Sequence, residues 1–265
     1  IRNFQNVKTI IEEFCPDYIF ILASESSVSK SYEFPHLYVE INAVGILNIL
    51  NAVRDSKIAK KVKIFHASSS EMFQSQNSAL NETSLMQPKS PYAISKFMAY
   101  EMTKSFRENF GIRIKNGILF NHESELRPSN FVTQKIVRDL LKIKFNKISN
   151  LVLGNLEITR DWGYAAEYMD AVKIITESSI DDDFIIATGV PTTLKRFIEI
   201  VIEILEIRVP IDELIKVDPK LFRTFDAPIL YGNPKKIYDT MGWKALVKVE
   251  SLIEKLIDFN LNKLN

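Results

Sequence analysis

The chain has 265 residues, of which 46% are hydrophobic, and its 34 basic and 33 acidic residues leave a formal net charge of +1. That length suffices for one large α/β domain or two modest ones, and the charge balance excludes the strongly basic surface that binds nucleic acids or membranes. A single cysteine, Cys15, excludes an internal disulfide and a cysteine-based metal site and fits a reducing compartment, so we expect a cytoplasmic protein.

Short apolar runs alternate with amphipathic segments along the chain. After a first helical segment, strands are predicted at 18–23, 62–68, 112–120, 151–154 and 184–189, and helices at 42–56, 91–109, 130–143 with Asn130 as its cap, 165–178, 193–206 and 250–263. No apolar run approaches the ~20 residues of a membrane helix. The alternation predicts an α/β fold, a Rossmann-like doubly wound parallel sheet.

The eight glycines are dispersed, and none has the spacing of G-x-G-x-x-G or of a P-loop. Because the chain also starts with a helix that leads into a strand, we expect the first βαβ unit of the sheet to be missing. Only three histidines are present, and no carboxylate cluster has the spacing of metal ligands, so no metal site is expected.

One motif with chemical potential is Tyr-x-x-x-Lys, which places a phenol and an ammonium on one face of a helix. The spacing occurs three times, so it decides nothing by itself: Tyr92/Lys96, Tyr100/Lys104 and Tyr231/Lys235. The last pair spans Gly-Asn-Pro, which is not a helical sequence. An ordinary surface helix is the alternative for each pair.

The surroundings of Tyr92 select the first pair. The strand 62–68 runs directly into Ser68–Glu71, and ligands of parallel sheets bind at the carboxyl ends of the strands. Ser90 and Pro91 are typical of a helix start, which puts Tyr92 in the first turn. Free tyrosine has a pKa of about 10, and a helix N-terminus and the Lys96 ammonium both favour the phenolate. Tyr92 is therefore the predicted general base.

The serines and the glutamate after the strand supply the other catalytic groups. Ser69 is expected to hydrogen-bond the substrate oxygen that Tyr92 deprotonates, with Ser68 and Ser70 as competitors. Glu71 is the acid–base candidate, although it could instead cap the strand end or face solvent. Such a group of residues suits removal of a sugar hydroxyl proton while hydride leaves for a nicotinamide.

Several motifs together resemble the extended short-chain dehydrogenase/reductase family and, within it, the GDP-mannose 4,6-dehydratases. They are "ASSSEMF", "SPYAISK", "NGILFNHES" with "NFVTQKI", "LASESSV", "LGNLEITRDWGYAAEYMDAV", "FIIATG", "FRTFDAPILYGNPKK" and "MGWKA". The resemblance covers nearly the whole chain. It implies a lyase that converts GDP-mannose to GDP-4-keto-6-deoxymannose with NADP, or NAD, as internal hydride carrier. It also implies a homodimer or homotetramer.

The resemblance assigns roles to individual residues. It makes Tyr92 the base, Lys96 its helper, Ser69 the hydroxyl partner and Glu71 the group that takes the C5 proton and assists loss of water. The cofactor-binding set also includes Tyr92 and Lys96, together with Leu22, Ala23, Ser24, Glu25, Ser26, His122 and Arg127. The substrate-binding set is Asn121, Asn130, Lys135, Arg160 and Arg223. It further implies a nucleotide-cofactor domain at 1–120 and 158–190 and a smaller nucleotide-sugar domain at 121–157 and 191–265.

Alternatives remain for some of these assignments. His122 could be a structural histidine, and Arg160 could form an ion pair with its neighbour Asp161. The family's usual histidine is Ser27 here, and only Arg127 survives from its "PRRG" segment. A sibling reductase, epimerase or decarboxylase is the alternative enzyme. A non-catalytic fragment is the alternative for the chain by itself, which we expect to bind GDP more tightly than NADP because it lacks the glycine-rich turn.

Overall fold

The computed structural model describes residues 1–263, and its centre is a parallel sheet of four strands. The strands are β1 (Tyr18–Ile21), β2 (Lys63–Ser69), β3 (Arg113–Leu119) and β7 (Phe184–Ile186), in the spatial order β1-β2-β3-β7. Every neighbouring pair is parallel. This arrangement confirms the predicted α/β class.

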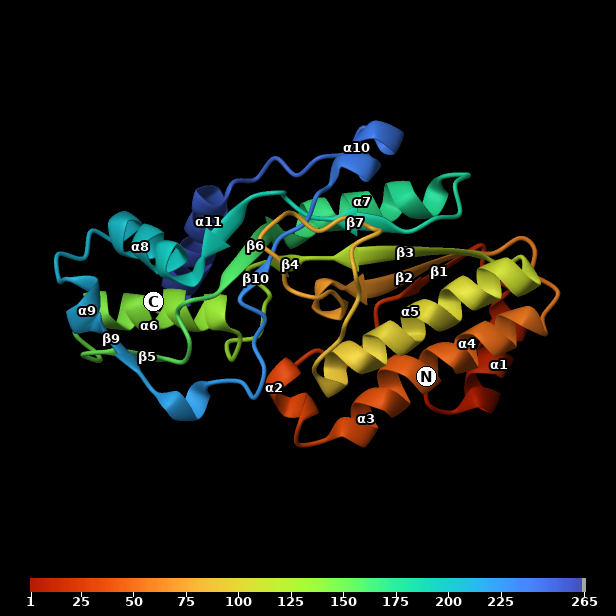
Figure 1. Ribbon diagram of the computed structural model, residues 1–265, viewed down its shortest axis with the longest axis horizontal. Coiled ribbons are helices and arrows are strands. Elements are labelled where there is room, and N and C mark those ends of the chain that lie inside the picture. The colour runs from red at the N-terminus through yellow and green to blue at the C-terminus, as the bar shows by residue number, and fades with distance from the viewer. Residues whose placement is uncertain (264–265) are drawn as a thin grey trace.

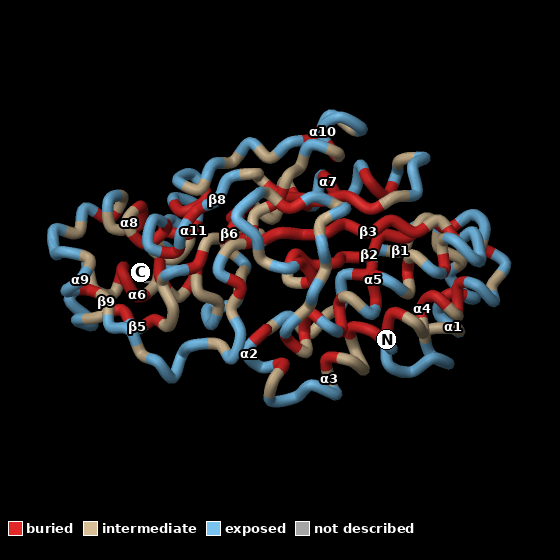
Figure 2. Tube along the Cα trace, in the orientation of Figure 1, coloured by how far each residue is buried: buried red, intermediate tan, exposed pale blue. Residues whose placement is uncertain are grey.

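Helices cover both faces of this sheet (Figure 1). On one face lie α1 (Phe4–Phe14), α4 (Gly45–Arg54) and α5 (Pro91–Phe110), and on the other lies α7 (Ala165–Glu177). Successive residues of β2 pack on opposite faces, because Ile64 joins the core under α4 and α5 while Phe65 joins the core under α7. Strands covered on both sides by helices are buried, and Figure 2 shows β2 and β3 buried along most of their length.

The helix predicted at 42–56 begins earlier in the structure. α3 (Pro35–Val39), the π-helical turn η1 (Glu40–Val44) and α4 form one continuous helix, Pro35–Arg54. By length and composition its 20 residues could cross a membrane, so the expectation that no segment approaches that length is wrong. Half of the segment is buried inside the protein, where α4 packs on α1 and α5 as a core helix does.

A second group of elements adjoins the carboxyl ends of the sheet. It contains β4 (Asn121–Glu123), β6 (Thr159–Tyr164), β8 (Pro191–Thr193) and β10 (Ile229–Leu230) in one small sheet, and β5 (Leu151–Leu153) paired with β9 (Ile215–Val217). The helices α6 (Val132–Lys144), α8 (Leu194–Ile204) and α11 (Val249–Asn262) share one apolar core with β5, β6 and β9. The short helices are α2 (Val28–Ser31), η2 (Ser70–Met72), α9 (Ile211–Leu214), η3 (Pro219–Leu221) and α10 (Lys235–Met241).

Three local predictions need correction. The strand at 151–154 lies in the small β5–β9 pair and not in the central sheet. Residues 159–164, which were not predicted as a strand, form β6, the centre of the second sheet. Asn130 is exposed and does not cap α6, whose N-cap position is Phe131 without a side-chain hydrogen bond. The division into two domains with the predicted boundaries stays a prediction.

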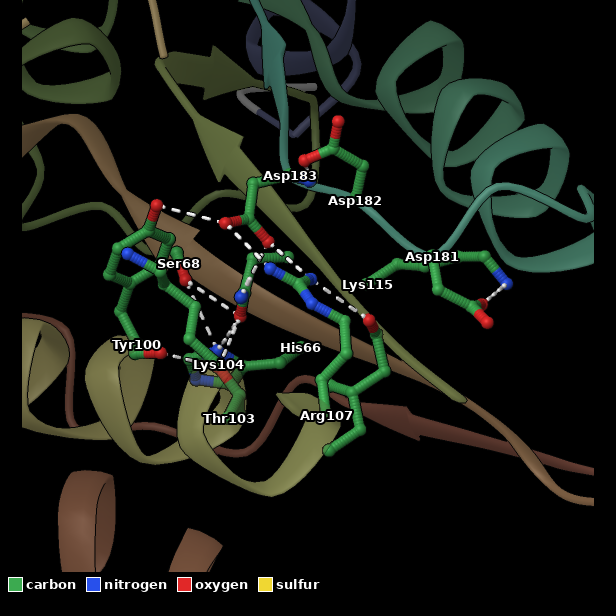
Figure 3. A network of polar contacts seen from close by, with 12 residues as sticks. His66, Ser68, Tyr100, Thr103, Lys104, Arg107, Lys115, Asp181, Asp182 and Asp183 are labelled. Carbon is green, nitrogen blue, oxygen red and sulfur yellow. Dashed lines mark hydrogen bonds and ion pairs between the residues drawn. The ribbon is translucent and has the colours of Figure 1, made fainter. Parts of the chain in front are cut away.

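A buried polar cluster ties α5 to the sheet and to the residue before β7. We use this name for Asn116 together with five residues that Figure 3 labels: His66, Tyr100, Thr103, Arg107 and Asp183. His66 is fully buried, and its Nδ1 lies 2.8 Å from Oδ1 of Asn116. Burial, reinforced by the charge of Lys96, lowers the pKa of His66 to about 3.

The lowered pKa of His66 predicts a pH-dependent stability. The unfolded chain takes up the proton near pH 6.5 and the folded protein only near pH 3. The contribution of His66 to the free energy of unfolding is therefore fully present above pH 6.5. Below pH 6.5 it falls by up to about 1.4 kcal/mol per pH unit. In urea titrations, wild type should lose more unfolding free energy between pH 7 and pH 5 than His66→Gln. Equal losses in the two proteins would contradict this assignment.

Candidate active site

The carboxyl end of β2 is shaped by a serine cap. β2 ends at Ser69, whose hydroxyl accepts a hydrogen bond from the Glu71 backbone N–H at 3.3 Å and so starts the short helix η2. This turn directs the Glu71 side chain toward the same space as Ser69, beyond the carboxyl end of the sheet. The placement agrees with the rule that ligands bind at this edge.

The start of α5 follows the predicted pattern. Ser90 accepts a hydrogen bond from the backbone N–H of Ala93 at 3.1 Å, and Pro91 occupies the first turn. Tyr92 and Lys96 are therefore one turn apart on the face that meets β2. The Lys96 ammonium donates to the Ala67 carbonyl at 2.9 Å, and Tyr92 retains 8% exposure at the cavity wall.

The protonation of this pair differs from the expectation. Burial raises the pKa of Tyr92 to about 12, the charge of Glu71 adds to the rise, and the nearby Ser69 hydroxyl and Arg127 only partly oppose it. Burial also lowers the pKa of Lys96 to about 8. The expected preference for the phenolate is thus wrong for the protein without ligands, because desolvation outweighs the stabilising neighbours.

The other two Tyr-x-x-x-Lys pairs have different roles. The Tyr100 hydroxyl donates to Asp183 at 2.9 Å inside the buried polar cluster. Tyr231 precedes α10, which begins only at Lys235, so this pair does not share a helical face. Neither tyrosine lines the cavity beside Ser69 and Glu71. The structure therefore places only the first pair where the sequence expects the reaction.

The segment 22–26 is held by one asparagine of the π-helical turn. Asn42 is buried, and its Oδ1 accepts from the Glu25 backbone N–H at 2.9 Å while its Nδ2 donates to the Glu25 carbonyl at 2.9 Å. The same amide reaches the Ser95 hydroxyl of α5 at 3.0 Å. This bridge fixes the segment against α5, and sequence reasoning missed it because Asn42 is far from every motif.

The segment that follows β3 brings two predicted cofactor contacts to the cavity. His122 Nδ1 lies 2.8 Å from the Phe120 carbonyl, and burial lowers the pKa of His122. Arg127 pairs with the buried Glu123 at 3.3 Å and stacks on the Phe131 ring, 3.7 Å from its centroid. Both side chains are thereby oriented by neighbours, while both still line the cavity.

A second wall of the site, which contains Arg160, Arg223 and Lys135, is basic. Arg160 is 2% exposed and pairs with Asp226 at 2.6 Å, and Arg223 pairs with the same carboxylate at 3.4 Å. Asp161, the alternative partner of Arg160, instead accepts from Thr188. Lys135 of α6 donates to the Val152 carbonyl. Arg160 also donates to the carbonyls of Thr159 and Ala227, whereas the half-buried Arg223 donates one N–H to Asp226 and has further donors for an anion.

One cavity of about 870 Å³ unites these walls. The predicted residues that line it are Leu22, Ser24, Ser26, Ser69, Glu71, Tyr92, Lys96, Asn121, His122, Arg127, Asn130, Lys135, Arg160 and Arg223. Ala23 and Glu25 do not line it. Arg138 and Asp226 do, although sequence reasoning missed both. Arg138 is three residues after Lys135 in α6, and this helical spacing could have indicated it.

Comparison with known proteins identifies the family. The profile described as GDP-mannose 4,6 dehydratase matches residues 1–256. The chain is 37% identical over 263 residues to GDP-mannose 4,6 dehydratase 2 of Arabidopsis thaliana, covering 98% of this chain and 70% of that protein. The chain belongs to the GDP-mannose 4,6-dehydratase family. A further member, from Yersinia enterocolitica, is 32% identical over 289 residues, with 99% of this chain and 78% of that protein covered.

Solved structures support the fold of this dehydratase-family chain. RMD from Pseudomonas aeruginosa, complexed with NADPH, matches with a TM-score of 0.86 at 19% identity over 98% of this chain and 86% of that one. UDP-glucose 4-epimerase of Thermotoga maritima, with UDP-glucose, matches with a TM-score of 0.87 at 20% identity over 100% and 83%. At these identities the likeness concerns the fold.

Proposed function

We propose that the protein is a GDP-mannose 4,6-dehydratase, a lyase that eliminates water from GDP-mannose to give GDP-4-keto-6-deoxymannose. The observation that carries the proposal is that Tyr92, Lys96, Ser69 and Glu71 line the same cavity as a basic wall containing Arg223. The first group suits proton transfer at a sugar, and the second suits a diphosphate. Membership of the family supports the same reaction.

In the proposed mechanism, Tyr92 takes the proton of the sugar 4-hydroxyl while Ser69 hydrogen-bonds that oxygen. Glu71 then removes the C5 proton, and the 6-hydroxyl leaves as water with a proton returned from the same carboxyl. Tyr92 finally returns the proton of the 4-hydroxyl to the sugar at C5, which restores the phenolate and completes the 4-keto-6-deoxy product. Because the pKa of Tyr92 is about 12 in the protein alone, a positive charge at the site is needed to favour the phenolate. The Lys96 ammonium, which uses one of its three donors on Ala67, is positioned to contribute it.

The residues around Lys96 fit the nicotinamide end of NADP. Ser24 and Ser26 line the cavity with Lys96 and His122, and the segment that carries the serines is held by Asn42. These residues would hold the nicotinamide and its ribose. When bound, NADP supplies the hydride acceptor and donor that moves hydrogen from C4 to C6. We propose NADP, with NAD as the alternative, since the described residues offer no contact that separates them.

The proposed function is tested by turnover and by selectivity. The chain is assayed with GDP-mannose and NADP, both as it stands and joined to a glycine-rich phosphate-binding turn, and the product is sought by mass spectrometry as loss of one water. Calorimetry compares GDP-mannose with UDP-glucose. Conversion of GDP-mannose and preference for it over UDP-glucose are expected. Absence of conversion in both forms, or oxidation without water loss, would overturn the proposal in favour of a sibling enzyme.

The basic wall makes a separate prediction about binding. Arg223 is about one-third exposed, so its contact with a diphosphate is screened by solvent but is still charge-assisted. Arg223→Ala should weaken GDP binding roughly ten-fold in calorimetry. Arg196→Ala, which removes an equally charged side chain paired with Glu203 outside the cavity, is the matched control and should bind GDP as wild type does. An equal loss in both variants would remove Arg223 from the diphosphate site.

We also propose a homo-oligomer that associates through the exposed side of α5 and of the adjoining helix Pro35–Arg54. Val44, Ile94, Met98 and Phe110 are each at least 36% exposed there. In Figure 1, α5 and α4 lie side by side at the surface of the molecule. Exposed apolar side chains on paired helices are typical of an interface. The single cysteine supports the further proposal of a cytoplasmic location.

A further inference from the structure

The catalytic helix α5 carries two sets of polar residues on the side that meets the sheet. Tyr92 and Lys96 lie near its N-terminus, and Thr103 and Arg107 lie two to three turns later. The later residues belong to the buried polar cluster, which does not line the cavity. The helix is therefore attached to the sheet by hydrogen bonds at a distance from the reaction.

Asn116 of β3 is the centre of these attachments. Its Oδ1 lies 2.9 Å from the Thr103 hydroxyl and 2.8 Å from Nδ1 of His66, and its Nδ2 donates to Asp183 at 2.8 Å. All four side chains are buried. One asparagine thus joins α5, β2, β3 and the segment before β7.

The charges inside the cluster are balanced. Both terminal nitrogens of Arg107 donate hydrogen bonds to the Asp183 carboxylate, at 2.8 and 3.2 Å. Burial by itself would raise the pKa of Asp183, but the contacts with Arg107, Asn116 and Tyr100 lower it overall, so the carboxylate stays ionised. The hydrogen bonds among Asp183, Arg107 and Asn116 favour one packing arrangement of these side chains.

The cluster and the reactive groups share the same two elements. On β2, His66 lies three residues before Ser69 and is adjacent to Ala67, whose carbonyl accepts a hydrogen bond from Lys96. On α5, Thr103 is seven residues, about two turns, after Lys96. Apolar packing alone is non-directional and allows a helix to slide or rotate slightly, whereas these hydrogen bonds define one register.

We propose that Asn116, Thr103 and Asp183 are positioning residues, which hold α5 in the register that places Tyr92 beside Ser69 and Lys96 on Ala67. This inference rests on the proposed function for its kinetic consequence, but not for its structural one. A displacement of about 1 Å at a reacting group costs up to roughly a hundred-fold in rate. Loosening the cluster should therefore lower kcat while leaving substrate affinity unchanged.

The test uses Thr103→Val, which keeps the shape of the side chain and removes its hydroxyl. Hydrogen exchange of the peptide covering residues 91–97 should accelerate at least about five-fold, because the N-terminal half of α5 opens more often. In the form that converts GDP-mannose, kcat should fall roughly ten-fold with KM within about two-fold. Thr103→Ser restores the hydroxyl and should return both quantities to wild-type values.

A control separates positioning from general loss of stability. Val53→Ala truncates a fully buried residue of α4 in the core beneath α5, and it should lower the melting temperature without changing exchange at 91–97 or kcat. Asn116→Ala provides a second variant with the same expected effects as Thr103→Val.

The outcomes distinguish this inference from the proposed function. If wild type does not convert GDP-mannose, the proposed function fails while the exchange measurement still decides the inference. If Thr103→Val and Asn116→Ala exchange at 91–97 no faster than Val53→Ala, or if Thr103→Ser behaves as Thr103→Val does, the positioning role is overturned.

Discussion

Tyr92→Phe is expected to remove about 2–4 kcal/mol of transition-state stabilisation from GDP-mannose conversion, the range for loss of a general base. The phenylalanine keeps the ring that packs edge-on against Tyr38, with centroids 6.4 Å apart, so the fold should be unaffected. The measurement is kcat/KM for GDP-mannose, accompanied by the melting temperature and by GDP affinity, both of which should stay near wild type.

The other two tyrosines of the repeated motif supply the comparison. Tyr231→Phe removes a hydroxyl outside the cavity and should leave conversion unchanged. Tyr100→Phe removes the hydrogen bond to Asp183 and should cost about 1 kcal/mol of stability, with less than a ten-fold loss of rate. Equal impairment of Tyr92→Phe and Tyr100→Phe would show that the wrong tyrosine has been taken as the base.

Glu71→Gln is expected to lower the rate of water elimination roughly 10²- to 10⁴-fold, the range for a positioned acid–base group. An amide can neither take the C5 proton nor return one to the leaving oxygen. Oxidation at C4 depends on Tyr92 and should persist slowly. Single-turnover absorbance of reduced nicotinamide, followed together with the mass of the sugar product, separates the two steps.

A surface carboxylate provides the control for this variant. Glu101 lies on α5 beside Lys104 and outside the cavity, so Glu101→Gln should eliminate water as wild type does. Glu71 also acts electrostatically on Tyr92 and Arg160. Glu71→Gln should therefore change the affinity for GDP-mannose, but by no more than a few-fold. Unchanged overall turnover would remove Glu71 from the mechanism.

Local sequence patterns were sufficient to predict the helix α5 and the strand before it, β2. Ser90 and Pro91 predict a helix start, and the structure has that cap. The apolar run at 62–68 predicts a buried strand, which is β2. These features depend on neighbours within a few residues, namely capping hydrogen bonds, side-chain periodicity and burial of a continuous apolar run. The carboxyl ends of parallel strands meet at one edge of the sheet. These local features therefore also predict that one cavity is lined by Tyr92, Lys96, Ser69 and Glu71.

Other features depend on contacts that no local pattern contains. Arg160 pairs with Asp226, 66 residues later, and not with its neighbour Asp161. Tyr100 is bonded to Asp183, 83 residues away, and Asn42 reaches the segment 22–26 through a π-helical turn. Such partners meet only after the order of the strands and the packing of the helices are established.

The protonation of the site belongs to this second group. Sequence spacing places an ammonium and a helix N-terminus near Tyr92, and both favour the phenolate. The folded protein buries the phenol and raises its pKa to about 12. Desolvation depends on all atoms around a group, including those from distant segments, so the sequence determines which groups can react, while the tertiary structure determines their charge before a ligand binds.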